Sequence, residues 1–430
     1  MKNGLDADVV VIGSGISGLV AALRSQLSGL RTIVVEKSQR AGGLCGTFLF
    51  EGHEFAFGCN DFGTGFEKEL LELGVEVTFH RPRAEFNFGA RRLQLPPNAA
   101  TLWRLALRPW ALNRLIRGAK RASTLGELID QHIDDDLLKD VASLPAFALM
   151  RSPDDVSLRL LGRELSKELG YGYDNSRTPI GGPSALIGQM VKRLLALGGA
   201  LRLGSEVLEI RRQDGRFSVE TSAGALGCRH VLTSQGRWDA FPEGSKPGLS
   251  VAAALLVVDT GAFTLPKNVH TLDWFEPGLA QMLRDLDRGV LVARPSFHAF
   301  CSDIPPRDQR RSITAFVPLS RGEQALTADR RASLLDHVCE RLNALYPGFK
   351  DGLVGCCLLS PDEVLERTGA LLVPSPLVPP VAFDKPASYD ARTGLYHVGT
   401  SVGPPGDHAG AAALSGKLAA QQVIAACAGA

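Results

Sequence analysis

Alternation between apolar runs and glycine-rich turns is clearest at the start of the chain. The β-branched run Val9–Ile12 is followed by a glycine-rich turn and then by apolar residues at helical spacing through Leu19 and Leu23. A second apolar run, RTIVV, ends on Glu36. The pattern therefore predicts a strand, a turn, a helix and a second strand in direct succession.

Further along the chain the periodicity changes several times. Residues 62–80 predict a helix and a strand, and residues 99–170 are mostly helical in pattern. Short strands are expected at 200–211, 216–221 and 230–236, and from 249 onward in SVAAALLVVD, GVLVARPSFHAF and RSITAFVPL. A helix at about 328–346 and a strand near 353–359 complete the pattern.

The first turn carries the spacing Gly13-x-Gly15-x-x-Gly18. In such a unit the first glycine permits a tight turn, the second lets the backbone approach a pyrophosphate, and the third allows close helix–strand packing. The helix N-terminus favours the phosphates. Glu36 lies at the spacing at which a carboxylate accepts hydrogen bonds from the adenosine ribose. The unit predicts a bound dinucleotide, and its acid disfavours a 2′-phosphate.

Arg40, Gly42 and Gly43 follow the acid. This continuation resembles the RxGG segment of glutathione-reductase-like and amine-oxidase-like flavoproteins, in which glycine amides reach the pyrophosphate and the arginine adds a charge. An ordinary glycine-rich loop is the alternative. Because no second GxGxxG follows a strand, we expect one dinucleotide site, with FAD as the resident cofactor and no built-in NADPH domain.

Composition limits the class of protein. The 430 residues exceed one ordinary core, which favours two domains, and a formal net charge of +1 argues against a nucleic-acid partner. The eight cysteines show no CxxC pair and no metal-ligand spacing, which predicts reduced thiols and no metal site. A strand follows MKNGLDA directly, and no apolar run reaches the roughly 18–20 residues of a membrane span, so we expect a cytoplasmic protein.

The chain as a whole resembles the phytoene-desaturase-related branch of the FAD-dependent amine-oxidase-like oxidoreductases. The glycine motifs above carry the resemblance together with EGHEFAFGCN, GGPSALIGQMVKRLLALGGALRLGSEVLEI, SPDEVLERTGA and GLYHVGTSVGPPGDHAGAAALSGKLAA. The expected fold is α/β: a Rossmann-like FAD-binding domain assembled from residues 1–80, 171–245 and 365–430. A substrate-binding domain of mixed sheet and helices, residues 81–170 and 246–364, is inserted between these pieces.

The resemblance also implies cofactor contacts. Gly399 and Thr400 would lie near the ribitol and pyrophosphate, Val207 would contact adenine, and the amides of Gly410 and Ala411 would face flavin N1 and O2. A positive helix end there stabilises the negative charge of reduced flavin. The complete predicted set is Gly13, Gly15, Ser17, Gly18, Glu36, Lys37, Arg40, Gly42, Gly43, Val207, Gly399, Thr400, Gly410 and Ala411.

Three side chains are candidates for proton transfer: His408, Asp407 and Asp61. Asp407 and His408 replace small residues of the related motif close to the expected flavin, and an imidazole titrates near neutral pH. In the alternative interpretation Asp407 caps the helix and His408 only fills space. Cys59 is a candidate for covalent flavin attachment, and His53 is expected to be a loop or packing residue.

The segment 101–122 carries six basic residues and no acid, with two tryptophans among its apolar residues. This pattern predicts either peripheral contact with anionic lipid or a solvated basic helix face.

The sequence thus predicts an FAD-dependent oxidoreductase that dehydrogenates a C–C or C–N bond of a polar amine, an amino-acid-derived or a prenyl-lipid metabolite, acting as a monomer or homodimer. A reduced-flavin isomerase or saturase, and a non-catalytic FAD-dependent binding or redox-sensing protein, are the alternatives.

Overall fold

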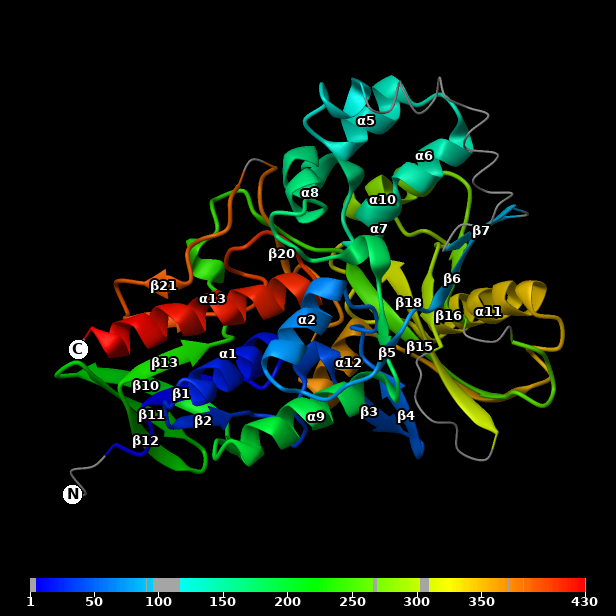
Figure 1. Ribbon diagram of the computed structural model, residues 1–430. Helices are drawn as coiled ribbons and strands as arrows, with labels where there is room; N and C mark the ends of the chain where they lie inside the picture. Colours follow the sequence, from blue (N-terminus) through cyan, green and yellow to red (C-terminus); the bar gives the residue numbers. More distant parts are fainter. Residues whose placement is uncertain are drawn as a thin grey trace.

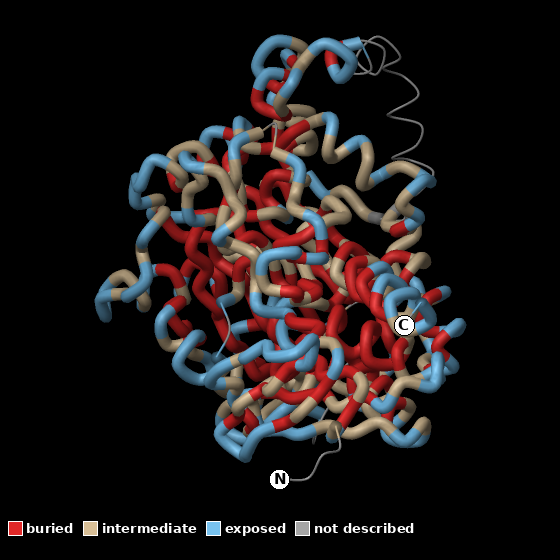
Figure 2. Tube along the Cα trace, turned by 90° about the vertical axis from the view of Figure 1, so that its left-hand side faces the viewer, coloured by how far each residue is buried: buried red, intermediate tan, exposed pale blue. Residues whose placement is uncertain are grey.

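The computed structural model describes residues 5–89, 91–95, 117–265, 269–301, 309–369, 371–381 and 383–429. Two large sheets organise these residues, with helices packed against both (Figure 1). Figure 2 shows the buried segments gathered in the interior and the exposed segments around the rim. No helix within the described ranges is both long enough and apolar enough to cross a membrane.

The first sheet has six strands in the order β21-β22-β13-β1-β2-β9, all parallel except β21. Its strands are β1 (Val9–Ile12), β2 (Thr32–Val35), β9 (Ala200–Arg202), β13 (His230–Thr233), β21 (Tyr389–Asp390) and β22 (Leu395–His397). All four residues of β1 are buried, as expected for a parallel strand covered on both faces. The sheet therefore combines the first, middle and last parts of the chain.

Helices cover one face of this sheet, and a small antiparallel sheet covers the other. The helices are α1 (Ile16–Leu27), α2 (Thr64–Glu72), α9 (Gly182–Ala196) and α13 (Ala409–Ala428), and the small sheet contains β10 (Val207–Gln213), β11 (Arg216–Thr221) and β12 (Gly224–Cys228). The first and last helices lie side by side (Figure 1). A Cβ on Gly416 would lie 2.2 Å from the Ser17 carbonyl oxygen, so the two backbones can approach this closely only with glycine at 416.

The second large sheet has seven strands in the order β19-β15-β18-β17-β16-β6-β7. They are β6 (Arg83–Phe88), β7 (Arg91–Leu95), β15 (Ser250–Asp259), β16 (Val269–Phe275), β17 (His298–Phe300), β18 (Arg310–Leu319) and β19 (Leu353–Leu359). The β16–β6 pair is parallel and the other pairs are antiparallel. This mixed sheet uses two stretches of the chain, one on each side of the β9–β13 region.

Several helices pack against the seven-stranded sheet. Helix α11 (Ala328–Leu345) packs Leu334, Val338 and Leu342 against one face. Short helices contribute to a second core, in the upper part of Figure 1: α5 (Leu125–His132), α6 (Asp136–Ala142), α7 (Leu144–Ala148), α8 (Leu158–Glu164) and α10 (Leu279–Asp287). The described ranges also contain α12 (Pro361–Thr368) and the strand pairs β3 (Thr47–Phe50) with β4 (His53–Ala56), β5 (Phe79–His80) with β8 (Thr178–Pro179), and β14 (Lys246–Pro247) with β20 (Leu377–Val378).

The predicted α/β class is confirmed, and so are the helix near 328–346 and the strand near 353–359. The strand predicted across GVLVARPSFHAF is wrong for most of its length, since only His298–Phe300 is extended in the sheet. Pro295 lacks an N–H to donate to a ladder, and the amide of Val290 instead donates to Asp285 at the end of α10. The division into two domains stays a prediction.

Candidate functional site

A cavity of about 470 Å³ lies where the two large sheets meet. One wall comes from the glycine-rich turns, at Gly15 and Gly42, and from Thr400 in the segment before α13. A second part of the wall is largely apolar and comes mainly from the seven-stranded sheet and the end of α7. Its lining includes Phe147, Met150, Val251, Phe300, Phe316, Leu372 and Val373.

The glycines of the first turn have different structural roles. A Cβ on Gly13, at φ +97°, would meet the Ser234 hydroxyl at 2.0 Å, and one on Gly18 would meet the Gly13 carbonyl oxygen at 2.1 Å. The fold itself therefore requires these two glycines. Gly15 has an ordinary φ of −67°, and a Cβ there would come no closer than 4.0 Å to another protein atom, the Gly42 carbonyl oxygen. Space beside Gly15 is left open on the cavity side.

The second turn lies against the first. The Gly42 amide donates to the Ser14 carbonyl oxygen at 3.0 Å, and Gly15 and Gly42 form a parallel bridge. Gly43, at φ +54°, would place a Cβ 3.3 Å from the Gly15 Cα. The two turns thus form one backbone surface along the cavity.

Glu36 is buried at the end of β2 and is already well bonded. One carboxylate oxygen accepts from the Ser14 amide and hydroxyl, both at 2.8 Å, and the other accepts from the Ser38 amide at 2.9 Å. A carboxylate has about four acceptor sites, so one remains for a ribose hydroxyl. Lys37 donates to the Gly369 carbonyl oxygen at 3.1 Å, and Arg40 reaches toward the Thr47 carbonyl oxygen at 3.5 Å.

The structure brings only part of the predicted FAD set to the cavity wall. Gly15, Ser17, Gly42, Gly399 and Thr400 line the cavity. The other predicted residues are not part of its lining: Gly13, Gly18, Glu36, Lys37, Arg40, Gly43, Val207, Gly410 and Ala411.

The flavin contact expected of the Gly410 and Ala411 amides stays a prediction, and the two amides are already hydrogen-bonded. The Gly410 amide donates to the Tyr173 hydroxyl, and the Ala411 amide donates to Nδ1 of His408, each at 3.2 Å. Both N–H groups expected to face the flavin therefore have partners within the protein. His408 and Ala409, which directly precede these two residues, line the cavity.

His408 is the N-cap of α13, so the alternative that Asp407 caps the helix is wrong. Edge-on ring contacts to Tyr171 and Tyr173, each with centroids 4.6 Å apart, enclose the imidazole, and its Nε2 lies 3.7 Å from Glu164. Burial lowers the pKa of His408 to about 4. With Nδ1 accepting a helix amide and so low a pKa, the imidazole is a weak proton acceptor. Its catalytic role stays a prediction that this geometry disfavours.

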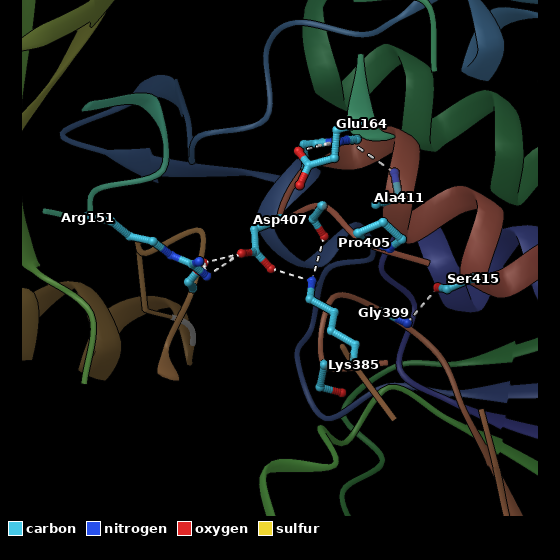
Figure 3. Close-up of polar contacts among 12 residues, drawn as sticks. Arg151, Glu164, Lys385, Gly399, Pro405, Asp407, Ala411 and Ser415 are labelled. Atoms are coloured by element: carbon cyan, nitrogen blue, oxygen red, sulfur yellow. Dashed lines mark hydrogen bonds and ion pairs between the residues drawn. The ribbon is translucent and has the colours of Figure 1, made fainter. Parts of the chain in front are cut away.

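Asp407 belongs to a buried ionic network (Figure 3). Its carboxylate lies 2.5 Å from Arg151 and 2.7 Å from Lys385, and it also accepts from the Ser375 hydroxyl. Although burial opposes the charged form, Lys385 and Arg151 lower the pKa of Asp407. A carboxylate held in this way connects three parts of the chain and is a poor base.

Glu164, at the end of α8, faces this network and His408. Burial, with a smaller contribution from the nearby Asp407 charge, raises the pKa of Glu164 to about 7. Its neighbours make a second cavity of about 250 Å³ that shares Asp407 with the first.

Asp61 lines the main cavity, as its predicted role requires. Its Oδ1 accepts from the Thr178 hydroxyl at 3.4 Å and lies 3.6 Å from Nε2 of the buried His270. Cys59 lines the cavity as well, and none of the eight cysteines, all of which lie in the described ranges, forms a disulfide. His53 lies on β4, away from the cavity lining.

Sequence analysis missed one polar pair at this site. His298 lines the cavity, and its Nδ1 lies 2.5 Å from the buried carboxylate of Asp273. The signal that could have found His298 is the alternation in FHAF, which places His298 and Phe300 on the same face of β17. No group of three His, Cys, Asp or Glu side chains in the described part of the chain could hold a metal ion.

The family model of flavin containing amine oxidoreductases matches residues 16–424. The chain belongs to this family. FAD is its cofactor. The residues fit FAD, because the backbone beside Gly15 is left open by other protein atoms and borders the cavity of about 470 Å³.

Individual relatives agree with the family. A phytoene desaturase (lycopene-forming) of Pseudescherichia vulneris is 23% identical, over 92% of this chain and 94% of that protein. Prolycopene isomerase 1 of an Oncidium hybrid cultivar is 25% identical, over 97% of this chain and 84% of that protein. Some other curated relatives match over 12% of their own length or less. An oxidoreductase structure from Methanosarcina mazei shares the fold, with a TM-score of 0.65, 16% identity and coverage of 98% and 99%.

Replacement of Gly15 tests the cradle. Gly15→Ala adds a methyl group that no protein atom opposes, so the thermal unfolding midpoint of the flavin-free protein should stay unchanged. The Kd for FAD should rise about tenfold or more, because the methyl group separates the backbone from the pyrophosphate. Flavin fluorescence quenching measures the Kd. Gly188→Ala, at an open position on α9, is the control, and an unaltered Kd in Gly15→Ala would refute the assignment.

The pKa of Glu164 predicts a pH-dependent stability. Since its pKa is about 7 in the folded protein against an ordinary 4.5, the folded state binds more protons between these values, and stability falls as pH rises through them. The group should cost up to about 3 kcal/mol at pH 8 relative to pH 4. Glu164→Gln should therefore lose less stability than the wild type between pH 5 and pH 8 in denaturant titrations. The exposed Glu168→Gln should behave as the wild type, and parallel curves for all three proteins would contradict the burial argument.

Proposed function

We propose that the protein dehydrogenates a C–C or C–N bond of a largely apolar small molecule. The observation that carries this proposal is the composition of the cavity lining. Glycine turns of the kind that binds a pyrophosphate and a group of aromatic side chains line the same cavity. When bound, FAD accepts a hydride. A hydride leaving an apolar substrate needs exclusion of water and a fixed orientation, and Phe147, Phe300 and Phe316 supply both.

The chain's own charges support reduction of a group in this cavity. The N-terminus of α13, at His408 and Ala409, lies in its wall, and a helix N-terminus carries a partial positive charge. Asp407 beside it is neutralised by Arg151 and Lys385. The helix end therefore acts on the cavity without an uncompensated carboxylate next to it.

The predicted domain layout fits this proposal. The cavity lining includes residues from the six-stranded sheet region, such as Ser17, and from the proposed substrate domain, such as Val251 and His298. We retain the discontinuous FAD-binding domain and the inserted substrate domain as part of the proposal. Of the basic segment 101–122, residues 101–116 lie outside the described residues, so lipid contact stays a prediction.

A second candidate is net isomerisation or saturation with reduced flavin. The similarity to prolycopene isomerase 1 over 97% of this chain favours it. A non-catalytic redox-sensing role would leave the apolar wall facing the flavin site without a purpose.

Anaerobic mixing of the FAD-loaded protein with single compounds tests these functions. Phytoene and prolycopene in detergent micelles represent apolar polyenes, and cyclohexylamine and an N-methylpyrrolidine represent amines. We expect one polyene to bleach the blue absorption band of the flavin stoichiometrically, because the cavity wall is apolar. Bleaching by amines alone would overturn the apolar-substrate proposal. Conversion of prolycopene only after chemical reduction of the flavin would favour the isomerase, and no conversion under either condition would refute both.

A further inference from the structure

In the part of the cavity wall that comes from the seven-stranded sheet, His298 is paired with the buried Asp273. His298 lies on β17 directly opposite Phe316 of β18, and its side chain is 26% exposed, toward the cavity that it lines. Asp273, on the adjacent strand β16, is 2% exposed. A carboxylate placed in the middle of an apolar sheet is costly unless it is paired, so this pair needs an explanation.

The contacts of Asp273 fix the orientation of the imidazole. Its Oδ1 lies 2.5 Å from His298 Nδ1 and also accepts from the Ala299 amide at 3.2 Å. The ring is further held edge-on against Phe300, with centroids 4.0 Å apart. Because Nδ1–H donates to the Asp273 carboxylate, Nε2 carries the lone pair in the neutral ring.

The charges around His298 favour uptake of a proton. Burial opposes the imidazolium, but the Asp273 carboxylate outweighs it and raises the pKa of His298, with a smaller contribution from Asp61. His270, also on β16, faces the same group of charges, and burial lowers its pKa, so it stays neutral. The positive charge of His298 is thus stabilised, whereas that of the neighbouring His270, which is not part of the cavity lining, is not.

We propose that Nε2 of His298 accepts the proton that the substrate loses during oxidation, and that Asp273 is its positioning residue. The inference rests on the proposed dehydrogenation. A substrate H–C–X–H, with X carbon or nitrogen, loses a hydride to the flavin and a proton to Nε2 while the C=X bond forms. Flavin and imidazole together receive both hydrogens and both electrons, so the half-reaction balances without a further reactant.

This pair differs from the candidates found in the sequence. Nδ1 of His408 accepts a hydrogen bond from the first turn of α13, and burial lowers the pKa of His408 to about 4. His298 does not cap a helix, and its pKa is raised. The raised pKa of His298 favours proton uptake, whereas the lowered pKa of His408 opposes it.

The test compares His298→Gln, Asp273→Asn and the control His230→Gln, whose ring lies against Tyr396 on the other sheet. Isotope-labelled histidine in the FAD-loaded protein gives an imidazole titration that His298→Gln removes. We expect the pKa of His298 to lie above the ordinary 6.5 in the wild type and below it in Asp273→Asn, where only the smaller effect of Asp61 opposes burial. This readout does not depend on turnover.

Flavin reduction under anaerobic conditions gives the second readout, using whichever of phytoene, prolycopene or cyclohexylamine bleaches the wild type. His298→Gln should slow reduction about 10²-fold with the FAD Kd unchanged, and Asp273→Asn should shift the rising limb of the pH–rate profile to lower pH. His230→Gln should match the wild type. A rate within threefold of wild type in His298→Gln overturns the proposal while the dehydrogenase function stands.

Other outcomes are equally decisive. If no compound bleaches the wild type, both the proposed function and the catalytic role of His298 are refuted. The titration still reports whether His298 and Asp273 are paired. If Asp273→Asn does not fold, the rate of His298→Gln decides alone. An Asp273→Asn protein whose His298 titration matches the wild type contradicts the positioning role.

Discussion

Close backbone approach at a few glycines is the constraint on which the rest of the structure depends. Gly13 and Gly18 allow the first turn to fold against β13 and α1, and Gly416 allows the last helix to touch the first. The Gly399 amide then donates to Ser415 at 2.8 Å and fixes the segment that enters this helix. A side chain at these positions would separate the elements whose ends make the cavity.

The cavity follows from that assembly, because its two walls belong to different sheets. The glycine turns supply bare backbone for a dinucleotide, and the β15, β17 and β18 strands supply apolar side chains with one paired histidine. The charged side chains beside the two walls have different partners. Asp407 is neutralised by two cations, whereas the His298–Asp273 pair leaves a ring nitrogen for chemistry.

Local patterns in the sequence were sufficient to predict the nucleotide-binding unit, since Gly15, Gly18 and Glu36 contact neighbours within about thirty residues. Contacts between distant segments could not be predicted in this way. The cap formed by His408, the Arg151–Asp407–Lys385 network and the pairing of Asp273 with His298 all depend on which strands and loops become neighbours. Pro295 also interrupts an apolar run that periodicity alone assigns to a strand.

The crystal structure of the FAD-loaded protein tests the central claim most directly, namely that one cavity joins the glycine cradle to the His298 wall. The account predicts the pyrophosphate against Gly15 and Gly42 and the reactive edge of the flavin open to a space bordered by His298 and Phe300. A flavin ring separated from His298 by protein side chains, or a pyrophosphate bound away from Gly15, would contradict it.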